Sequence, residues 1–181
     1  MSSPTTPHLP HLPFFVYGTL RPGEVNHDRF LRDRTLHEHP ARLPGAVLYD
    51  GPGYPYAVEE PGGVMTSGVT ASGPETGGTV TGGTVASGPE TGGTVAGELV
   101  TARPEAYDRL LAELDRLEEY TPGDPRNLYE RVEREVVVLG ADRIAVRTAV
   151  RAWVYVAAPA VAARLRARGK LLEGGDWLAR R

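Results

Sequence analysis

Apolar side chains recur between residues 104 and 119 at the spacing of one helical face. The apolar members of this face are Tyr107, Leu110, Leu111, Leu114 and Leu117. Intervals of three and four residues bring side chains onto the same side of an α-helix. Pro104 is suited to the first turn, and Thr121-Pro122-Gly123 ends the pattern. The spacing therefore predicts an amphipathic helix from about residue 104 to about residue 119.

The other apolar stretches are short and predict β-strands. Residues 146–157 alternate between an apolar face and a face that carries arginines and aromatic rings. Further strands are expected at residues 14–17, 41–49 (broken at Pro44-Gly45), 54–58, 95–100 and 129–139, and further helices at residues 26–33 and 159–168. Strands, then one long helix, then more strands is the order of an α+β fold, not of an alternating βαβ fold.

Two segments lack the composition of a packed core. Residues 1–13 hold four prolines, and residues 66–94 consist largely of Gly, Ser and Thr, with Ser72–Val80 repeated as Ser87–Val95. Such segments bury too little apolar surface to offset the entropy lost on ordering. We expect a disordered tail at 1–13 and a single domain at 14–181. A low-complexity insertion at about 66–94 would interrupt a hairpin between Tyr56 and Leu99.

Composition and charge exclude several classes of function. The chain contains no cysteine and carries a formal net charge of −3, which removes thiol chemistry and gives no basic field for nucleic acid or an anionic membrane. All serines lie in the two low-complexity segments, away from any rigid turn with a positioned base. His37-Glu38-His39 lacks a third ligand for a metal. We therefore expect no cofactor, no metal, no nucleic acid and no membrane, and a cytoplasmic protein without a signal segment.

Glu118 is the one acidic residue that the helical projection places on the buried face. At 100° per residue it falls inside the arc of the apolar side chains, and Asp115 falls just outside that arc. The other acidic residues that point elsewhere are Glu105, Asp108, Glu113 and Glu119. Burial and a helix C-terminus both raise the pKa of a carboxyl toward the range of proton transfer at neutral pH. The alternative is a helix that frays at Leu117 and leaves Glu118 in water.

A second candidate is the loop that follows the first strand. Val16-Tyr17-Gly18-Thr19-Leu20 combines a strand end with a glycine, and such a loop can turn successive backbone N–H groups toward an anion. A helix start near Asn26 would add to this. The alternative is an ordinary turn without a ligand.

These pieces together resemble the γ-glutamylcyclotransferase family in its short, AIG2-like branch. The matching residues are Val16-Tyr17-Gly18-Thr19-Leu20-Arg21-Pro22-Gly23, Asn26, Tyr54-Pro55, Gly97-Glu98-Leu99, Leu114-Asp115-Arg116-Leu117-Glu118, Tyr129-Glu130-Arg131, Trp153-Val154-Tyr155 and Gly175-Asp176-Trp177. The similarity covers about residues 14–178 without the insertion. It implies a small, mixed, partly closed β-barrel flanked by helices.

The resemblance also implies an activity and its site. In such proteins the loop carried here by Tyr17, Gly18, Thr19 and Leu20 binds the γ-glutamyl moiety, and the glutamate of the LDxxE motif, here Glu118, is the catalytic acid and base. Tyr129 is a further pocket-wall residue. The family often has glycine after the catalytic glutamate, whereas this chain has Glu119.

The implied reaction needs no nucleophile from the protein. The substrate's own α-amine attacks its γ-carbonyl, which closes a five-membered ring and releases 5-oxoproline and a free amine. The protein must orient the glutamyl chain and move one proton. Two alternatives remain open: a non-catalytic binding module of the same fold, and an interaction protein whose insertion is the functional part. We expect a small-molecule γ-glutamyl substrate and a monomer or homodimer.

Overall fold

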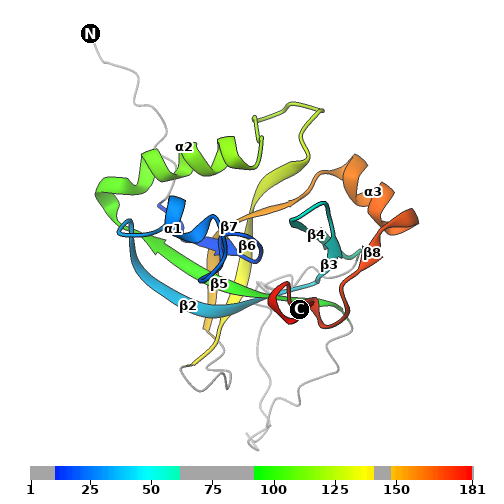
Figure 1. The fold of residues 1–181 in the computed structure, drawn as a ribbon, viewed down its shortest axis with the longest axis horizontal. Helices are drawn as coiled ribbons and strands as arrows, with labels where there is room; N and C mark the ends of the chain where they lie inside the picture. The colour runs from blue at the N-terminus through cyan, green and yellow to red at the C-terminus, as the bar shows by residue number, and fades with distance from the viewer. Residues whose placement is uncertain (1–10, 62–91, 141–147, 181) are drawn as a thin grey trace, which may run out of the picture.

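A five-stranded β-barrel forms the centre of the molecule (Figure 1). The computed structural model describes residues 11–61, 92–140 and 148–180. The barrel strands are β1 (Phe14–Val16), β2 (Thr35–Pro44), β5 (Thr94–Ala102), β6 (Tyr129–Val138) and β7 (Thr148–Ala157), in the order β1-β5-β2-β6-β7. All neighbours are antiparallel except β1 and β7, whose parallel pairing at Phe14 and Trp153 closes the ring. The prediction of a small mixed barrel is confirmed, and the barrel is closed.

A smaller sheet packs beside the barrel and corrects one expectation. It contains β3 (Ala46–Asp50), β4 (Pro55–Glu59) and β8 (Lys170–Leu171), in the order β4-β3-β8. The strand with Tyr56 pairs with β3, while the strand with Leu99 pairs with β1 and β2. The expected hairpin between Tyr56 and Leu99 is therefore wrong, because the turn at Gly51-Pro52-Gly53 already pairs β4 with its predecessor.

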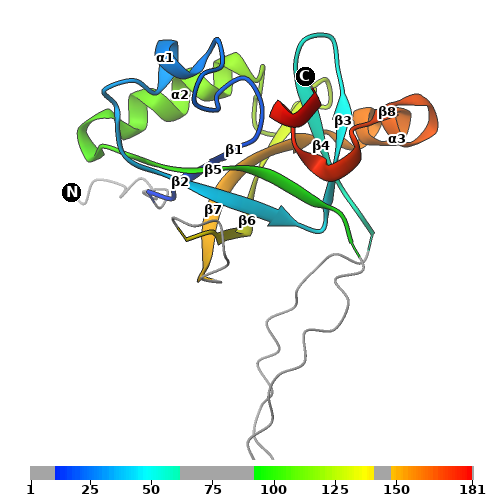
Figure 2. The same cartoon turned by 60° about the horizontal axis from the view of Figure 1, so that its bottom comes forward.

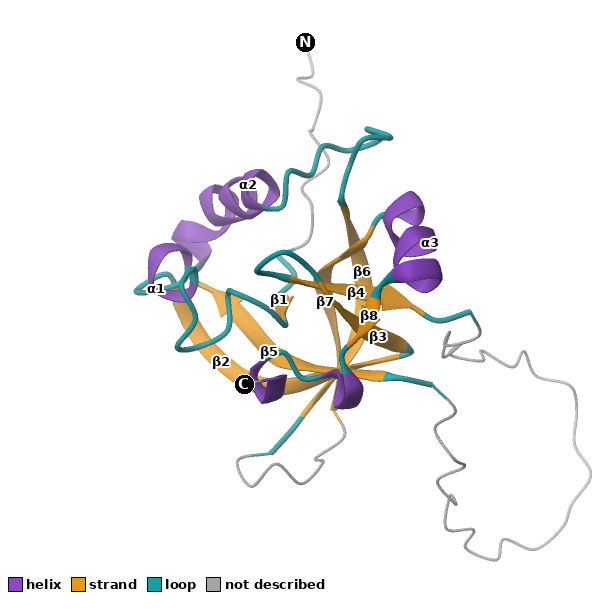
Figure 3. Ribbon diagram, turned by 45° about the vertical axis from the view of Figure 1, so that its right-hand side comes forward, coloured by secondary structure: helices purple, strands orange, loops and turns teal. Residues whose placement is uncertain are grey.

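Helices cover the strands from two sides (Figures 2 and 3). On one side lie α1 (His27–Phe30) and α2 (Tyr107–Leu117), which follows a 3₁₀ turn, η1 (Pro104–Ala106). On the other side α3 (Pro159–Arg168) lies next to the small sheet, and the 3₁₀ turns η2 (Glu173–Gly175) and η3 (Leu178–Arg180) end the chain. The helix expected at 159–168 is confirmed, whereas the one expected at 26–33 spans only four residues.

The amphipathic helix covers the barrel with the face that the spacing predicts. Tyr107, Leu110 and Leu114 are buried, and Leu111 and Leu117 pack at the margin of the same core. Burying one such side chain contributes about 1.5–3 kcal/mol. The helix ends two residues earlier than expected.

The segments of low complexity lie almost wholly outside the described residues. Residues 1–10 and 62–91 lie outside the described residues. Of the turn expected at Gly140-Ala141-Asp142, only Gly140 is described. Residues at the end of the expected tail contact the domain: the Pro13 carbonyl accepts from the N–H of Trp153, and the Leu12 carbonyl accepts from the hydroxyl of Tyr107, both at 2.9 Å.

One buried cation ties three distant segments together. Arg21 donates to both carboxylate oxygens of Glu98 on β5, at 2.6 and 2.9 Å, and to Oδ1 of Asp176 near the C-terminus at 2.6 Å. The side chain of Arg21 is only 9% exposed and that of Glu98 14%. This ion-pair cluster fixes the chain directly after the glycine loop, so it sets where that loop stands on the barrel.

Replacing Arg21 by methionine should lower the free energy of unfolding by about 3–5 kcal/mol, because Glu98 would stay buried without its partner. Urea denaturation measures the change. The matched control is Arg126→Met: Arg126 pairs with Asp124 but is 87% exposed, and such exposed pairs contribute little to stability. Similar losses in the two variants would contradict a special role for the buried cluster.

Candidate active site

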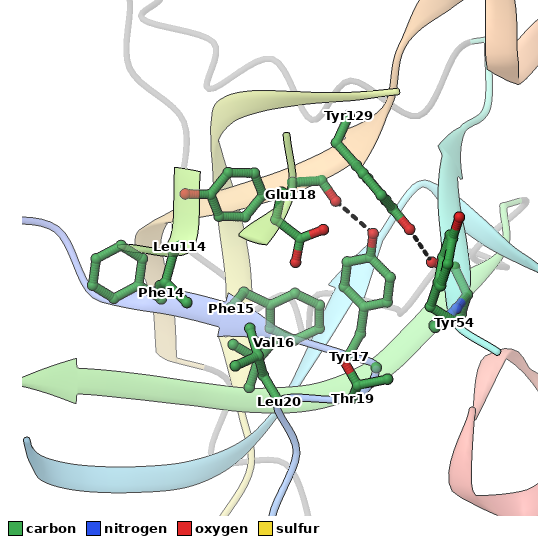
Figure 4. Close-up of a pocket in the computed structure, with 13 residues that line it drawn as sticks. Phe14, Phe15, Val16, Tyr17, Thr19, Leu20, Tyr54, Leu114, Glu118 and Tyr129 are labelled. Carbon is green, nitrogen blue, oxygen red and sulfur yellow. Dashed lines mark hydrogen bonds between the residues drawn. The ribbon is translucent and has the colours of Figure 1, made fainter. Parts of the chain in front are cut away.

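A pocket opens where the end of β1, the end of α2 and the start of β6 meet (Figure 4). The space between these elements is about 490 Å³ when the part open to solvent is included. It is lined by Phe14, Phe15, Val16, Tyr17, Gly18, Thr19, Leu20, Tyr54, Pro55, Leu114, Glu118, Tyr129 and Tyr155. All six residues predicted for the site are among them, so the structure brings them together around one space.

Glu118 enters the pocket as the residue that caps α2. The helix ends at Leu117, and the backbone N–H of Glu118 still donates to the carbonyl of Leu114 at 2.9 Å. Its side chain therefore keeps the direction that the helical projection assigns, although the helix itself has stopped. Figure 4 shows the carboxylate pointing toward the side of the pocket where Tyr17 stands. Of the two alternatives, the inward orientation is the one observed.

The turn after Glu118 is a Schellman motif, in which the last carbonyls of a helix accept from residues beyond its end. The N–H of Glu119 donates to Arg116 at 3.3 Å, and the N–H of Tyr120 donates to Asp115 at 2.8 Å. This motif needs a left-handed residue after the cap, and Glu119 has φ +52°. The position is one where glycine is favoured, and this chain has an L-residue there.

The carboxyl of Glu118 has no countercharge. Among the described residues no side chain donates a hydrogen bond to it or forms an ion pair with it. Burial alone raises the pKa of Glu118 from its ordinary 4.5 to about 7, because a charged group loses water there without gaining a partner. Near neutral pH this carboxyl is therefore half protonated and can both give and take a proton.

The surrounding phenols are uncharged at neutral pH. Burial is the largest cause that raises the pKa values of Tyr17, Tyr56, Tyr129 and Tyr155, and the nearby charge of Glu118 raises each of them further. Among the described lining residues Glu118 is the only Asp, Glu, Arg, Lys or His.

The two predicted tyrosines hold backbone segments through their hydroxyls. Tyr17 donates to the carbonyl of Tyr155 at 2.5 Å and accepts from the N–H of Ala57 at 3.3 Å. Tyr129 donates to the carbonyl of Pro55 at 2.8 Å. Both hydroxyl protons are therefore already used, and the rings serve as walls of the pocket.

The glycine loop is closely packed on one side and has free N–H groups. A Cβ atom on Gly18 would lie 2.8 Å from Cδ of Pro55, so only glycine fits without displacing that ring. The side chain and backbone N–H of Asn26 both donate to Thr19, each at 3.0 Å. Within the described part of the chain, the N–H groups of Gly18, Thr19 and Leu20 donate to no other residue. The loop can therefore offer successive donors to an anion.

A group of side chains that the sequence did not predict surrounds Asp115, one helical turn before Glu118. Asp115 accepts from Nη1 of Arg131 at 2.6 Å and from the hydroxyl of Tyr155 at 2.7 Å. The helical projection placed Asp115 outside the apolar arc, because it considers only the helix and not the strands beside it. The signal that could have revealed this group was the presence of Asp115 and Arg131 in the matching motifs.

The described residues contain no cluster suited to a metal ion and no helix suited to span a membrane. Within 11–61, 92–140 and 148–180, no group of three or more His, Asp or Glu side chains has an arrangement that could hold a metal ion. His37 and His39 stack on each other with ring centroids 5.8 Å apart. None of the described helices combines the length and the apolar character needed to cross a bilayer.

Comparisons with known proteins point to one family. The family described as gamma-glutamyl cyclotransferase, AIG2-like, matches residues 14–76 and 75–179. A curated relative from Niallia circulans, gamma-L-glutamyl-butirosin B gamma-glutamyl cyclotransferase, is 31% identical over 149 residues, which is 82% of this chain and 67% of that protein.

Two solved structures are also similar to this chain. One is an AIG2-like protein from Mus musculus, with 21% identity, coverage of 82% of this chain and 80% of that chain, and a TM-score of 0.49. The other is an uncharacterized protein from Pyrococcus horikoshii, with 19% identity, coverage of 92% and 89%, and a TM-score of 0.46.

Glu118→Gln should make the protein more stable at pH 8 than the parent. In the parent, the folded state binds this proton more tightly than the unfolded state, so stability falls as pH rises from 4.5 to about 7. The amide has no such proton, and the variant should gain about 2–3 kcal/mol at pH 8 and nothing near pH 4.5. Urea denaturation across this range measures it, with Glu119→Gln as the control. A gain that does not vary with pH would contradict the raised pKa.

Glu119→Gly should raise the melting temperature by about 2–4 °C, because an L-residue in left-handed backbone costs about 1 kcal/mol that glycine avoids. Differential scanning calorimetry measures the change. Gly123→Ala is the mirrored control: Gly123 has φ +75° in an open turn with no atom within 4 Å of the added Cβ, so alanine there should lower the melting temperature. An unchanged or lower value for Glu119→Gly would show that its side chain makes a compensating contact.

Proposed function

Because this chain belongs to the gamma-glutamyl cyclotransferase, AIG2-like family, we propose that it cleaves a γ-glutamyl amide by attack of the substrate's α-amine on its own γ-carbonyl. The products are 5-oxoproline and a free amine. The observation that carries this proposal is the unpaired carboxyl of Glu118, with a pKa of about 7, in a pocket formed by the glycine loop.

The reaction requires the attacking nitrogen, which enters as an ammonium and ends as the ring N–H, to lose two protons, and the leaving nitrogen gains both and departs as an ammonium. Glu118 as carboxylate takes a proton from the α-ammonium, and the free amine then forms the new C–N bond. The carbonyl carbon passes through a tetrahedral state whose ring nitrogen still carries two hydrogens. Protonated Glu118 gives its proton to the leaving nitrogen as the old C–N bond breaks, and its carboxylate then moves the surplus proton of the ring nitrogen to the released amine. The carboxylate is regenerated and no water is consumed. A pKa near 7 suits a group that must act in both directions.

The glycine loop supplies the binding groups in this proposal. The free N–H groups of Gly18, Thr19 and Leu20 are suited to hold the α-carboxylate of the glutamyl moiety, since backbone donors carry no charge that would pair with Glu118. Tyr17 and Tyr129 form the walls that fold the glutamyl chain toward its cyclising conformation, and a fixed geometry of this kind accounts for a large part of such rate enhancements.

The lining residues favour a leaving group without a carboxylate. No Arg, Lys or His is among the described residues that line the pocket, so a carboxylate on the departing amine would lie near Glu118 without a countercharge. A γ-glutamyl derivative of a neutral or cationic amine avoids this repulsion. The curated relative is named for a γ-L-glutamyl conjugate, butirosin B.

Glu118→Gln should lower the rate of 5-oxoproline formation by at least about a hundredfold, because the amide keeps the shape of the side chain but moves no proton. The assay incubates the protein with a panel of γ-glutamyl amines and γ-glutamyl amino acids and quantifies 5-oxoproline. Glu119→Gln is the matched control: it makes the same change one residue away, at an exposed position, and should retain activity.

The outcomes separate the two functional alternatives. Full activity of Glu118→Gln would exclude the proposed role of this carboxyl. Binding of a γ-glutamyl compound by the parent without turnover would instead identify a non-catalytic module of the same fold.

A further inference from the structure

Arg131 contacts the chain on both sides of Glu118. On the N-terminal side its Nη1 donates to Oδ2 of Asp115 at 2.6 Å. On the C-terminal side its guanidinium lies over the ring of Tyr120, with Cζ 5.3 Å from the centroid, and over Trp153 at 5.1 Å. The six residues from 115 to 120 are also closed by the hydrogen bond between their ends. One side chain on β6 therefore clamps the turn that carries Glu118.

Asp115 also connects the turn around Glu118 with the glycine loop through hydrogen bonds. Its second oxygen accepts from the hydroxyl of Tyr155 at 2.7 Å, and the carbonyl of Tyr155 accepts from the hydroxyl of Tyr17 at 2.5 Å. Tyr17 directly precedes Gly18. Two hydrogen bonds, one to the hydroxyl of Tyr155 and one to its backbone carbonyl, thus connect the end of α2 with the residue before the glycine loop.

The clamp is also electrically neutral. Asp115 lies one helical turn before Glu118, where residues three apart are neighbours, so its charge alone would act on Glu118. Arg131 cancels it: the two side chains form a largely buried pair, 9% and 24% exposed. Nε of Arg131 has no hydrogen-bond partner among the described residues, so this pair and the two rings hold the guanidinium.

We propose that Asp115 and Arg131 are positioning residues for Glu118, which fix the turn around it and cancel each other's charge at the edge of the pocket. This inference rests on the proposed function in assigning Glu118 the proton transfer. Neither residue lines the pocket, so neither acts on the substrate directly.

The charged and titratable groups facing Glu118 are few. Tyr17 follows β1, Tyr56 stands on β4, Tyr129 on β6 and Tyr155 on β7, and each has an elevated pKa. From α2 itself comes Asp115, and from β6 Arg131. Asp115 and Arg131 also shift the pKa of Tyr155, in opposite directions, so the titration of Glu118 itself has to be measured when one charge of the pair is removed.

The test is a pair of substitutions with opposite expected shifts. Asp115→Asn leaves the positive charge of Arg131 unbalanced and should lower the pKa of Glu118 by about one unit, whereas Arg131→Gln leaves Asp115 unbalanced and should raise it by about one unit. The readouts are the acidic limb of kcat/KM, which should lie near pH 7 in the parent, and the ¹³C titration of the Glu118 carboxyl by NMR. A purely structural role would move both variants in the same direction.

Two further variants separate charge from geometry. Arg131→Lys keeps the charge and should restore the parent's titration. Tyr155→Phe removes one hydrogen bond to Asp115 without changing charge. It should lower kcat by about tenfold and leave the acidic limb of the kcat/KM profile at the same pH. Arg134→Gln is the control. Arg134 lies on β6 like Arg131, but it pairs with Glu59 of β4 and does not line the pocket. Its substitution should change neither the pH profile nor the NMR titration.

The outcomes distinguish this inference from the proposed function. If the parent releases 5-oxoproline and the titrations of Asp115→Asn and Arg131→Gln coincide with its own, the positioning role is overturned and the activity stands. If the parent is inactive on every γ-glutamyl compound, the activity fails, while opposite NMR shifts would still support the charge balance. If either variant unfolds, Arg131→Lys and Tyr155→Phe test the positioning role. A parental titration in both, with a lower kcat only in Tyr155→Phe, supports it, and an unchanged kcat in Tyr155→Phe overturns it.

Discussion

The left-handed turn at the end of α2 is the constraint on which the pocket depends. It stops the helix at Leu117, so that Glu118 becomes the capping residue, and it returns the chain through Glu119 and Tyr120. A helix continuing for one more turn would keep residues 118–120 in the regular helical path. The turn instead leaves one carboxyl at the edge of the buried space, with the chain leading away behind it. The strained backbone at Glu119 is the cost of that arrangement.

Stability and the proposed chemistry make opposite demands on Glu118. A partner for its carboxylate would stabilise the fold and lower its pKa, which would remove the group from the range of proton transfer at neutral pH. The surrounding structure satisfies its other buried charges: Arg21 pairs with Glu98 and Asp176, and Arg131 with Asp115. Glu118, the one carboxyl among the described residues that line the pocket, faces phenols that remain neutral. This contrast is why the pocket can be assigned a chemistry on physical grounds.

The motifs that match the family serve two different purposes. The glycine loop and Glu118 form the pocket itself. Arg21 follows that loop in the same motif, and Glu98 and Asp176 come from two further motif pieces; the three side chains meet only in the ion-pair cluster that holds the glycine loop in place. Asp115 and Arg131 meet behind Glu118 in the same way. Much of what makes the sequence recognisable is therefore support for the site rather than contact with a ligand.

Local patterns in the sequence determined the elements and the direction of the key side chain. The apolar spacing of 107–117 specifies the buried face of α2, and Glu118 still points to that side because the capping residue continues the last helical turn. The alternation in 148–157 likewise specifies a two-faced strand. These features depend on the periodicity of the backbone, which the sequence contains in full.

Tertiary structure alone decided which elements meet. The strand with Tyr56 pairs with β3 rather than with the strand of Leu99, and the choice depends on competing partners that no single segment reveals. Asp115 becomes important only through Arg131 and Tyr155, which lie 16 and 40 residues away in the chain. The pKa of Glu118 depends on how much water its neighbours exclude. Burial, pairing and charge compensation are properties of contacts between distant segments, and so they follow from the packed fold and not from any local pattern.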